Sequence, residues 1–165
     1  MPPRRMVANG LALAAILALG GALTPAPVVT LKAGTGGPNI CRSVAVGETF
    51  LLVFRHSMYG GEVREEFQAE DGRLVRTGVK TEKAAAAEYY AYDGRVEPAP
   101  DGYRVIVPPA TMDEVVIRLD RIGQHRLRFN DEELALTEPS SESVAATLRV
   151  ESVPLFARQL IPSAC

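Results

Sequence analysis

The stretch TFLLVFRHSMYGGEVREEFQAED, residues 49–71, decides the fold. Apolar and polar side chains alternate on both sides of its centre, which is typical of strands with one buried face. Gly60-Gly61 at the centre predicts a two-residue turn, because glycine adopts positive φ angles at little cost. The stretch therefore predicts an antiparallel hairpin that pairs Thr49–Met58 with Val63–Asp71.

A two-residue turn also fixes which residues of the hairpin lie opposite one another. The predicted pairs on one face are Met58 with Val63, His56 with Glu65, Phe54 with Phe67 and Leu52 with Ala69. Charged side chains pair on the other face, where Arg55 lies opposite Glu66. This separation of apolar and charged partners supports the register.

His56 and Glu65 form the main candidate site, because this register places them together on the apolar face. An imidazole beside a carboxylate favours the charged form of both groups, whereas burial disfavours it. Two interpretations stay open. The pair anchors a ligand carboxylate or a protein partner, or it is a buried ion pair that fixes the hairpin register. Strand alternation points Ser57 to the opposite face, so a hydrolase that uses His56 is the least supported alternative.

Residues 81–92 predict the one short helix of the chain. Thr81 is a suitable N-cap, and the alanine run Ala84–Ala87 favours helix. Three tyrosines cluster at its end: Tyr89, Tyr90 and Tyr92. These amphipathic rings either pack the helix onto the sheet or form the wall of a ligand pocket.

The rest of the chain predicts further short strands. They span residues 74–79, 103–107, 115–122, 125–129, 134–136 and 144–153. Short strands with frequent turns predict an all-β fold, mainly an antiparallel sandwich or barrel, with one short helix. His125 opens one of these strands after a Gly-Gln turn. It is therefore a surface turn residue or, alternatively, a further member of the site.

Residues 1–26 are typical of a signal peptide or a membrane anchor. Arg4 and Arg5 precede the apolar run Val7–Leu23, and no acidic residue occurs before Glu48. The run is at the short limit for crossing a membrane, so cleavage and anchoring both stay open. In either case the positive flank predicts that the following residues are exported to the outer side of the cytoplasmic membrane.

The Pro- and Gly-rich segment 27–40 is expected to be a linker, followed by a single β domain over residues 41–165. Cys41 and Cys165 lie at the two ends of that domain. In an oxidising compartment such a pair predicts one disulfide, worth roughly 4–5 kcal/mol in the chain-entropy model. No further cysteine or nearby histidine supports a metal site.

Composition limits the classes of function. Hydrophobic residues make up 47% of the 165-residue chain, which is too many for a disordered protein. The formal net charge of −2 and the lack of a basic cluster argue against nucleic-acid binding. The sequence also has no phosphate loop, no Cys-x-x-Cys pair and no nucleophile elbow. It therefore predicts a protein that is not an enzyme and uses no cofactor.

Three segments carry a resemblance to a known family: Phe54–Met58, Val63–Phe67 and Arg118–Leu127. With them the chain resembles the DUF1850 family of small exported bacterial proteins over roughly Cys41–Val153. Members of that family look like companions of TAXI-type TRAP transporters, whose binding proteins capture small organic acids outside the membrane. The resemblance implies transporter subunits, either the membrane permease or the TAXI-type binding protein, as partners, and a small organic acid as a ligand.

These observations predict an extracytoplasmic, non-enzymatic accessory or binding module of a TAXI-type TRAP transporter. The alternative is a stand-alone small-molecule-binding β domain that uses His56, Glu65 and the cluster of Tyr89, Tyr90 and Tyr92. His125 is a further candidate for ligand or partner binding.

Overall fold

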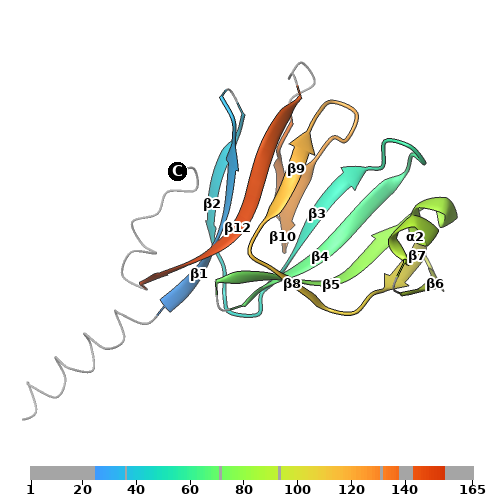
Figure 1. Cartoon of the computed structure of the whole chain (residues 1–165), viewed down its shortest axis with the longest axis horizontal. Coiled ribbons are helices and arrows are strands. Elements are labelled where there is room, and N and C mark those ends of the chain that lie inside the picture. Colours follow the sequence, from blue (N-terminus) through green and yellow to red (C-terminus); the bar gives the residue numbers. More distant parts are fainter. Residues whose placement is uncertain are drawn as a thin grey trace, which may run out of the picture.

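The computed structural model describes residues 25–35, 37–70, 72–92, 94–130, 132–137 and 143–154. These residues form twelve strands in two antiparallel sheets and one short helix (Figure 1). The predicted all-β fold with one short helix is therefore confirmed.

The smaller sheet has the strand order β2-β1-β12-β9. Its strands are β1 (Pro25–Ala33), β2 (Asn39–Ser43), β9 (Val115–Leu119) and β12 (Val144–Pro154). The interpretation of residues 27–40 as a linker is wrong, because β1 lies at the centre of this sheet with most of its residues buried. Its two prolines lie at the start of the strand, residues 28–31 are buried, and Val29 and Leu31 pack in the core.

The larger sheet has the strand order β11-β10-β3-β4-β5-β7-β6. The short strand β8 also pairs with β5, at the other end of β5 from β7. Its strands are β3 (Thr49–Arg55), β4 (Glu62–Glu70), β5 (Arg73–Thr81), β6 (Arg95–Ala99), β7 (Gly102–Ile106), β8 (Ala110–Met112), β10 (Arg126–Phe129) and β11 (Glu132–Ala135). Most neighbouring strands of this sheet are also consecutive in the chain, because short turns connect them.

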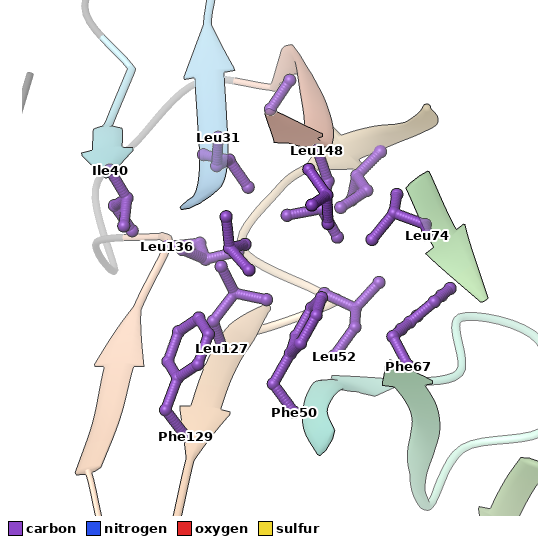
Figure 2. Packing of buried hydrophobic residues seen from close by; sticks show 14 of the residues in the cluster. Leu31, Ile40, Phe50, Leu52, Phe67, Leu74, Leu127, Phe129, Leu136 and Leu148 are labelled. Carbon is purple, nitrogen blue, oxygen red and sulfur yellow. The ribbon is translucent and has the colours of Figure 1, made fainter. Parts of the chain in front are cut away.

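The main core lies between the two sheets (Figure 2). Leu31 and Leu148 of the small sheet face the aromatic side chains of the large sheet. Phe50 stands at the centre, with ring centroids 5.8 Å from Phe67 and 5.3 Å from Phe129. All three rings are essentially inaccessible to solvent, so their burial contributes strongly to stability.

Helix α2 (Ala84–Tyr90) packs on β5 and β7, beyond the part of the large sheet that the small sheet covers. Ala87 of the helix packs against Val63, Val79 and Val105 of the sheet, and the four residues form a second, smaller apolar cluster. The helix is shorter than the predicted 81–92, because Thr81 still belongs to β5 and Lys83 occupies the N-cap position.

The predicted hairpin forms, but its register is wrong. Leu52 lies opposite Glu65, and Phe54 lies opposite Val63 instead of Phe67. Each β4 residue is thus shifted by four positions, an even number, so the same side chains still share a face. Residues 56–61 form a longer loop in place of the two-residue turn, although Gly60 and Gly61 do adopt positive φ angles.

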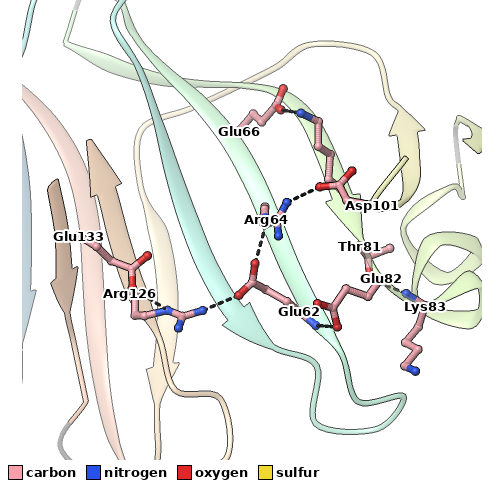
Figure 3. A network of polar contacts seen from close by, with 10 residues as sticks. Glu62, Arg64, Glu66, Thr81, Glu82, Lys83, Asp101, Arg126 and Glu133 are labelled. Atoms are coloured by element: carbon pink, nitrogen blue, oxygen red, sulfur yellow. Dashed lines mark hydrogen bonds and ion pairs between the residues drawn. The ribbon is translucent and has the colours of Figure 1, made fainter. Parts of the chain in front are cut away.

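The outward face of the large sheet carries a chain of ion pairs (Figure 3). Arg126 of β10 contacts Glu62 of β4 at 2.7 Å, and Glu62 also binds Arg64. Arg64 reaches Asp101 at 2.6 Å. These half-buried and exposed pairs connect strands that are far apart in the sequence.

Two predictions concern the ends of the chain. Cys41 is buried on β2 and is disulfide-bonded, whereas Cys165 lies outside the described residues, so the predicted pairing stays a prediction. The expected signal or anchor in residues 1–26 lies almost wholly outside them as well. The part of the chain that the structure describes contains no helix long and apolar enough to cross a membrane.

Candidate functional site

The candidate site is a cleft of about 600 Å³ between β9 and α2, which we call the β9–α2 cleft. Its floor is the large sheet, where Leu52, Phe54 and Glu65 line it. Tyr89 and Tyr90 form the helix wall, and the edge of β9 forms the opposite wall. Figure 1 shows β9 and α2 on the two sides of β3 and β4.

All five predicted binding residues line this one cleft: His56, Glu65, Tyr89, Tyr90 and His125. They come from the β3–β4 loop, strand β4, helix α2 and the loop before β10. Tyr92, the third member of the predicted tyrosine cluster, does not line the cleft and is 93% exposed. The fold therefore assembles the site from chain segments that are far apart in sequence.

His56 holds the β3–β4 loop in shape. Its Nδ1 atom accepts the backbone N–H groups of Met58 and Tyr59 at 3.2 and 3.3 Å. The backbone N–H of Gly60 also donates to the His56 carbonyl oxygen. These bonds curl residues 56–60 into a turn, which is why β3 ends at Arg55 and the predicted register fails.

The predicted ion pair between His56 and Glu65 is wrong, because no such pair forms among the described residues. The His56 ring instead packs among tyrosines, with centroid distances of 4.9 Å to Tyr59, 5.6 Å to Tyr89 and 6.3 Å to Tyr90. Since Nδ1 acts as an acceptor, a neutral ring carries its proton on Nε2 and can donate it to a ligand.

Glu65 lies on the cleft floor with Arg76 and Tyr90 as its polar neighbours. Burial raises the pKa of its carboxyl group, and the Arg76 charge and a hydrogen bond from the Tyr90 hydroxyl partly offset that shift. Burial, followed by the Glu65 charge, raises the pKa of Tyr90. Tyr90 therefore remains a hydrogen-bond donor at neutral pH.

Arg76 reaches this face of the sheet through an irregularity in β5. Glu66 pairs with Gly78 and the next residue, Phe67, pairs with Arg76, so Thr77 is an extra residue in the ladder. Such a bulge reverses the alternation of the residues beyond it. Arg76 consequently shares a face with Phe67, and its Nε atom is buried without a hydrogen bond among the described residues. Sequence reasoning missed Arg76, although Gly78 inside a strand is a signal for a bulge.

His125 is not the surface turn residue that its position suggested, because only 8% of it is exposed. Its ring stacks on Phe54 at 5.5 Å and fits tightly beneath Gly123. Burial lowers the pKa of its imidazole, and nearby Asp120 partly opposes that shift. The buried Nδ1 atom has no hydrogen-bond partner among the described residues, so a polar group remains unsatisfied beside the cleft.

The cleft combines an apolar floor with a few polar groups, as binding sites for small molecules commonly do. Ser57 also lines it. No hydrogen bond joins the Ser57 hydroxyl to His56 in the described residues, and His56 Nδ1 is already engaged with the loop backbone. The described residues hold no group of three or more side chains able to bind a metal ion.

Comparisons of the chain with family models, curated proteins and solved structures find no match. The resemblance to the DUF1850 family and the link to transport therefore stay predictions. The geometry of the β9–α2 cleft supplies the structural support for a function.

Proposed function

We propose that this protein is a non-enzymatic binding module that takes a small organic acid into the β9–α2 cleft. One observation carries the proposal: separate segments of the chain bring His56, Glu65, Tyr89, Tyr90 and His125 into a single cleft of ligand size. A cleft of about 600 Å³ lies within the range of roughly 300–1,000 Å³ that drug-sized ligands occupy.

The polar groups suit an acid that also has an apolar body. Leu52 and Phe54 offer an apolar floor, and the rings of Tyr89 and Tyr90 offer surfaces for stacking. The Nε2–H group of His56 is a donor for a carboxylate. The Tyr90 hydroxyl has a single proton, which it gives to Glu65, so it becomes a donor for the ligand when the ligand carboxylate replaces Glu65 as the acceptor. The raised pKa of Glu65 reduces the repulsion that a second carboxylate would meet, and repulsion decreases further as pH falls.

The setting of this activity is part of the same proposal. The positively flanked apolar run in residues 1–26 supports export to the outer side of the cytoplasmic membrane. The resemblance supports a role beside a TAXI-type TRAP transporter, with the permease or the binding protein as partner. Affinity capture from membranes tests this setting, because recovery of transporter subunits supports the accessory role and their absence favours a stand-alone binding domain.

Binding itself is tested by titrating the purified chain with succinate and with phenylacetate in a calorimeter. Phenylacetate is expected to bind more tightly, because its ring fits the apolar floor. Tyr90→Phe should weaken binding about five- to tenfold, the value of one hydrogen bond. Tyr92→Phe is the matched control, since Tyr92 lies outside the cleft. Equal affinities for the two variants, or no binding of either acid, would contradict the proposal.

A further inference from the structure

Strand β9 presents its backbone to the cleft. Four consecutive residues of this strand, 115–118, line the cleft, although neighbouring side chains of a strand point to opposite faces. Consecutive residues can share one wall only if that wall is the edge of the strand. Among the described strands β9 pairs with β12 alone, so the backbone groups along its other edge have no partner strand.

The outer edges of β2, β11 and β6 are protected. β2 and β11 lie beside each other, where Arg42 and Glu132 form an ion pair at 2.5 Å and Arg42 also covers the Phe129 ring. β6, at the far edge of the large sheet, contains Pro98, which cannot donate a ladder hydrogen bond. Proteins commonly protect edges in these ways against unwanted pairing.

The edge of β9 is less protected. It contains no proline and no bulge, and Arg118 is its one charged side chain, whereas the outward Val116 is 66% exposed. An exposed valine on an open edge favours the addition of another strand. The difference between β9 and the protected edges indicates that β9 is a docking edge.

The cleft has the dimensions that an added strand needs. A strand paired with β9 would lie about 4.8 Å from it, in the plane of the small sheet. That position lies between β9 and α2 and above Leu52 and Phe54, where the cleft is. The five residues of β9 would pair with a segment of similar length, roughly 17 Å long.

We propose that β9 pairs with an extended peptide segment of a partner protein, which completes the small sheet as a fifth strand. The inward side chains of this segment would be apolar, since they contact Leu52 and Phe54. Its outward side chains would include a β-branched residue near Val116 and an acidic residue near Arg118. The cleft lining contains Glu65 and Asp120 as well as Arg55 and Arg118, so the preference for an acidic residue is local to the position next to Arg118.

This inference goes beyond the proposed function, because it concerns a protein partner and needs no small ligand. A strand on β9 would nevertheless cover the floor on which the acid is proposed to rest. The two occupants would therefore exclude one another, and each would lower the apparent affinity of the other.

The test uses the full chain and a phage library of random seven-residue peptides as the probe. Selection should enrich peptides that alternate apolar with β-branched or acidic residues. In a synthetic copy of the best peptide, N-methylation of alternate amides on the side that pairs with β9 should weaken binding at least about tenfold, because main-chain hydrogen bonds are lost. Methylation of the opposite set should have a small effect. Hydrogen exchange should slow for β9 amides when the unmodified peptide binds.

Variants of the chain provide the second readout. Val116→Lys should weaken the peptide at least about tenfold, because a charged side chain protects an edge, whereas Val116→Thr should retain it. Val46→Lys is the matched control, since Val46 is a similarly exposed valine, at 69%, in the β2–β3 loop. The inference is overturned if no peptide is enriched, if the two methylated peptides bind with equal affinity, or if Val116→Lys binds the peptide unchanged. Acid binding without peptide binding would overturn this inference alone, and peptide binding without acid binding would overturn only the proposed ligand.

Discussion

The inward face of the large sheet has two differently covered ends. At one end the small sheet packs on it, and Phe50 and Phe67 are fully buried between the layers. At the other end a single short helix covers it, and Tyr89 on that helix is 61% exposed. The first end is a dry apolar core, whereas the second borders an open cleft.

Strands β3 and β4 run through both ends. Phe50 and Phe67 pair with each other in the core, and further along the same two strands Phe54 and Glu65 line the cleft. The positions that stabilise the fold and those that face a ligand are therefore separated along the strands. Substitutions at the two ends should have different consequences.

The largest effect is expected in the core. Phe50→Ala removes a ring that contacts two other buried rings, so it should lower the free energy of unfolding by about 3–5 kcal/mol. Tyr89→Ala is the control at the other end and should cost less than about 1 kcal/mol, because most of Tyr89 is exposed. Urea denaturation measures both values, and equal losses would show that the two ends do not differ.

The next effect comes from Glu65 on the cleft floor. Because its folded pKa is raised, the native state holds a proton that the unfolded state has lost above its ordinary pKa. Stability should therefore fall as pH rises from about 4.5 through the folded pKa, by up to about 1.4 kcal/mol per pH unit. Glu65→Gln does not titrate and should lack this slope. Thermal unfolding of both proteins between pH 4 and pH 8 tests this, and parallel curves would contradict it.

His125 should give a slope of opposite sign. Its folded pKa is lowered, so the unfolded state binds the additional proton and stability should fall as pH drops below about 6.5. Asp120 opposes part of the shift in the His125 pKa. His125→Gln removes the titrating ring, and its stability relative to the parent chain should rise between pH 6.5 and pH 5. A constant difference over that range would argue against a buried neutral imidazole.

The smallest effect is expected at His56. His56→Ala removes the acceptor of two loop N–H groups, but water can replace it at this exposed loop, so the cost should be about 1 kcal/mol. His56→Asn, which can still accept a local bond, should recover part of that loss. A loss of 3–5 kcal/mol would instead indicate the buried ion pair that the sequence predicted.

The sequence predicted the faces of the β3–β4 hairpin because alternation survives an even shift in register. It did not predict the register, since the bonds that His56 makes with the loop backbone set the loop length. Strand β1 was missed because its prolines and the glycines that follow resemble a linker. Local composition cannot show that Val28–Leu31 finds partners on β12, more than a hundred residues away.

The sequence predicted which residues belong to the candidate site, but not the contacts that these residues make. All five residues line one cleft, yet His56 and Glu65 are not the partners that the sequence suggested. The burial of His125 depends on Phe54 and Gly123, and the position of Arg76 depends on a bulge. These features arise from tertiary packing between segments that are far apart in the sequence, and the local pattern of apolar and polar residues does not show which segments meet.

The pairing of β1 with β12 has a mechanical consequence. Pro25 at the start of β1 lies opposite Pro154 at the end of β12, and the ladder runs from there to Ala33 and Ala146 (Figure 1). A force that pulls these two ends apart would unzip the ladder, so that its hydrogen bonds break in sequence from this end. If the disulfide of Cys41 is reduced, and the chain is tethered through its first residues and loaded through its last, this corner yields first, while the aromatic core of the sandwich carries little of the load.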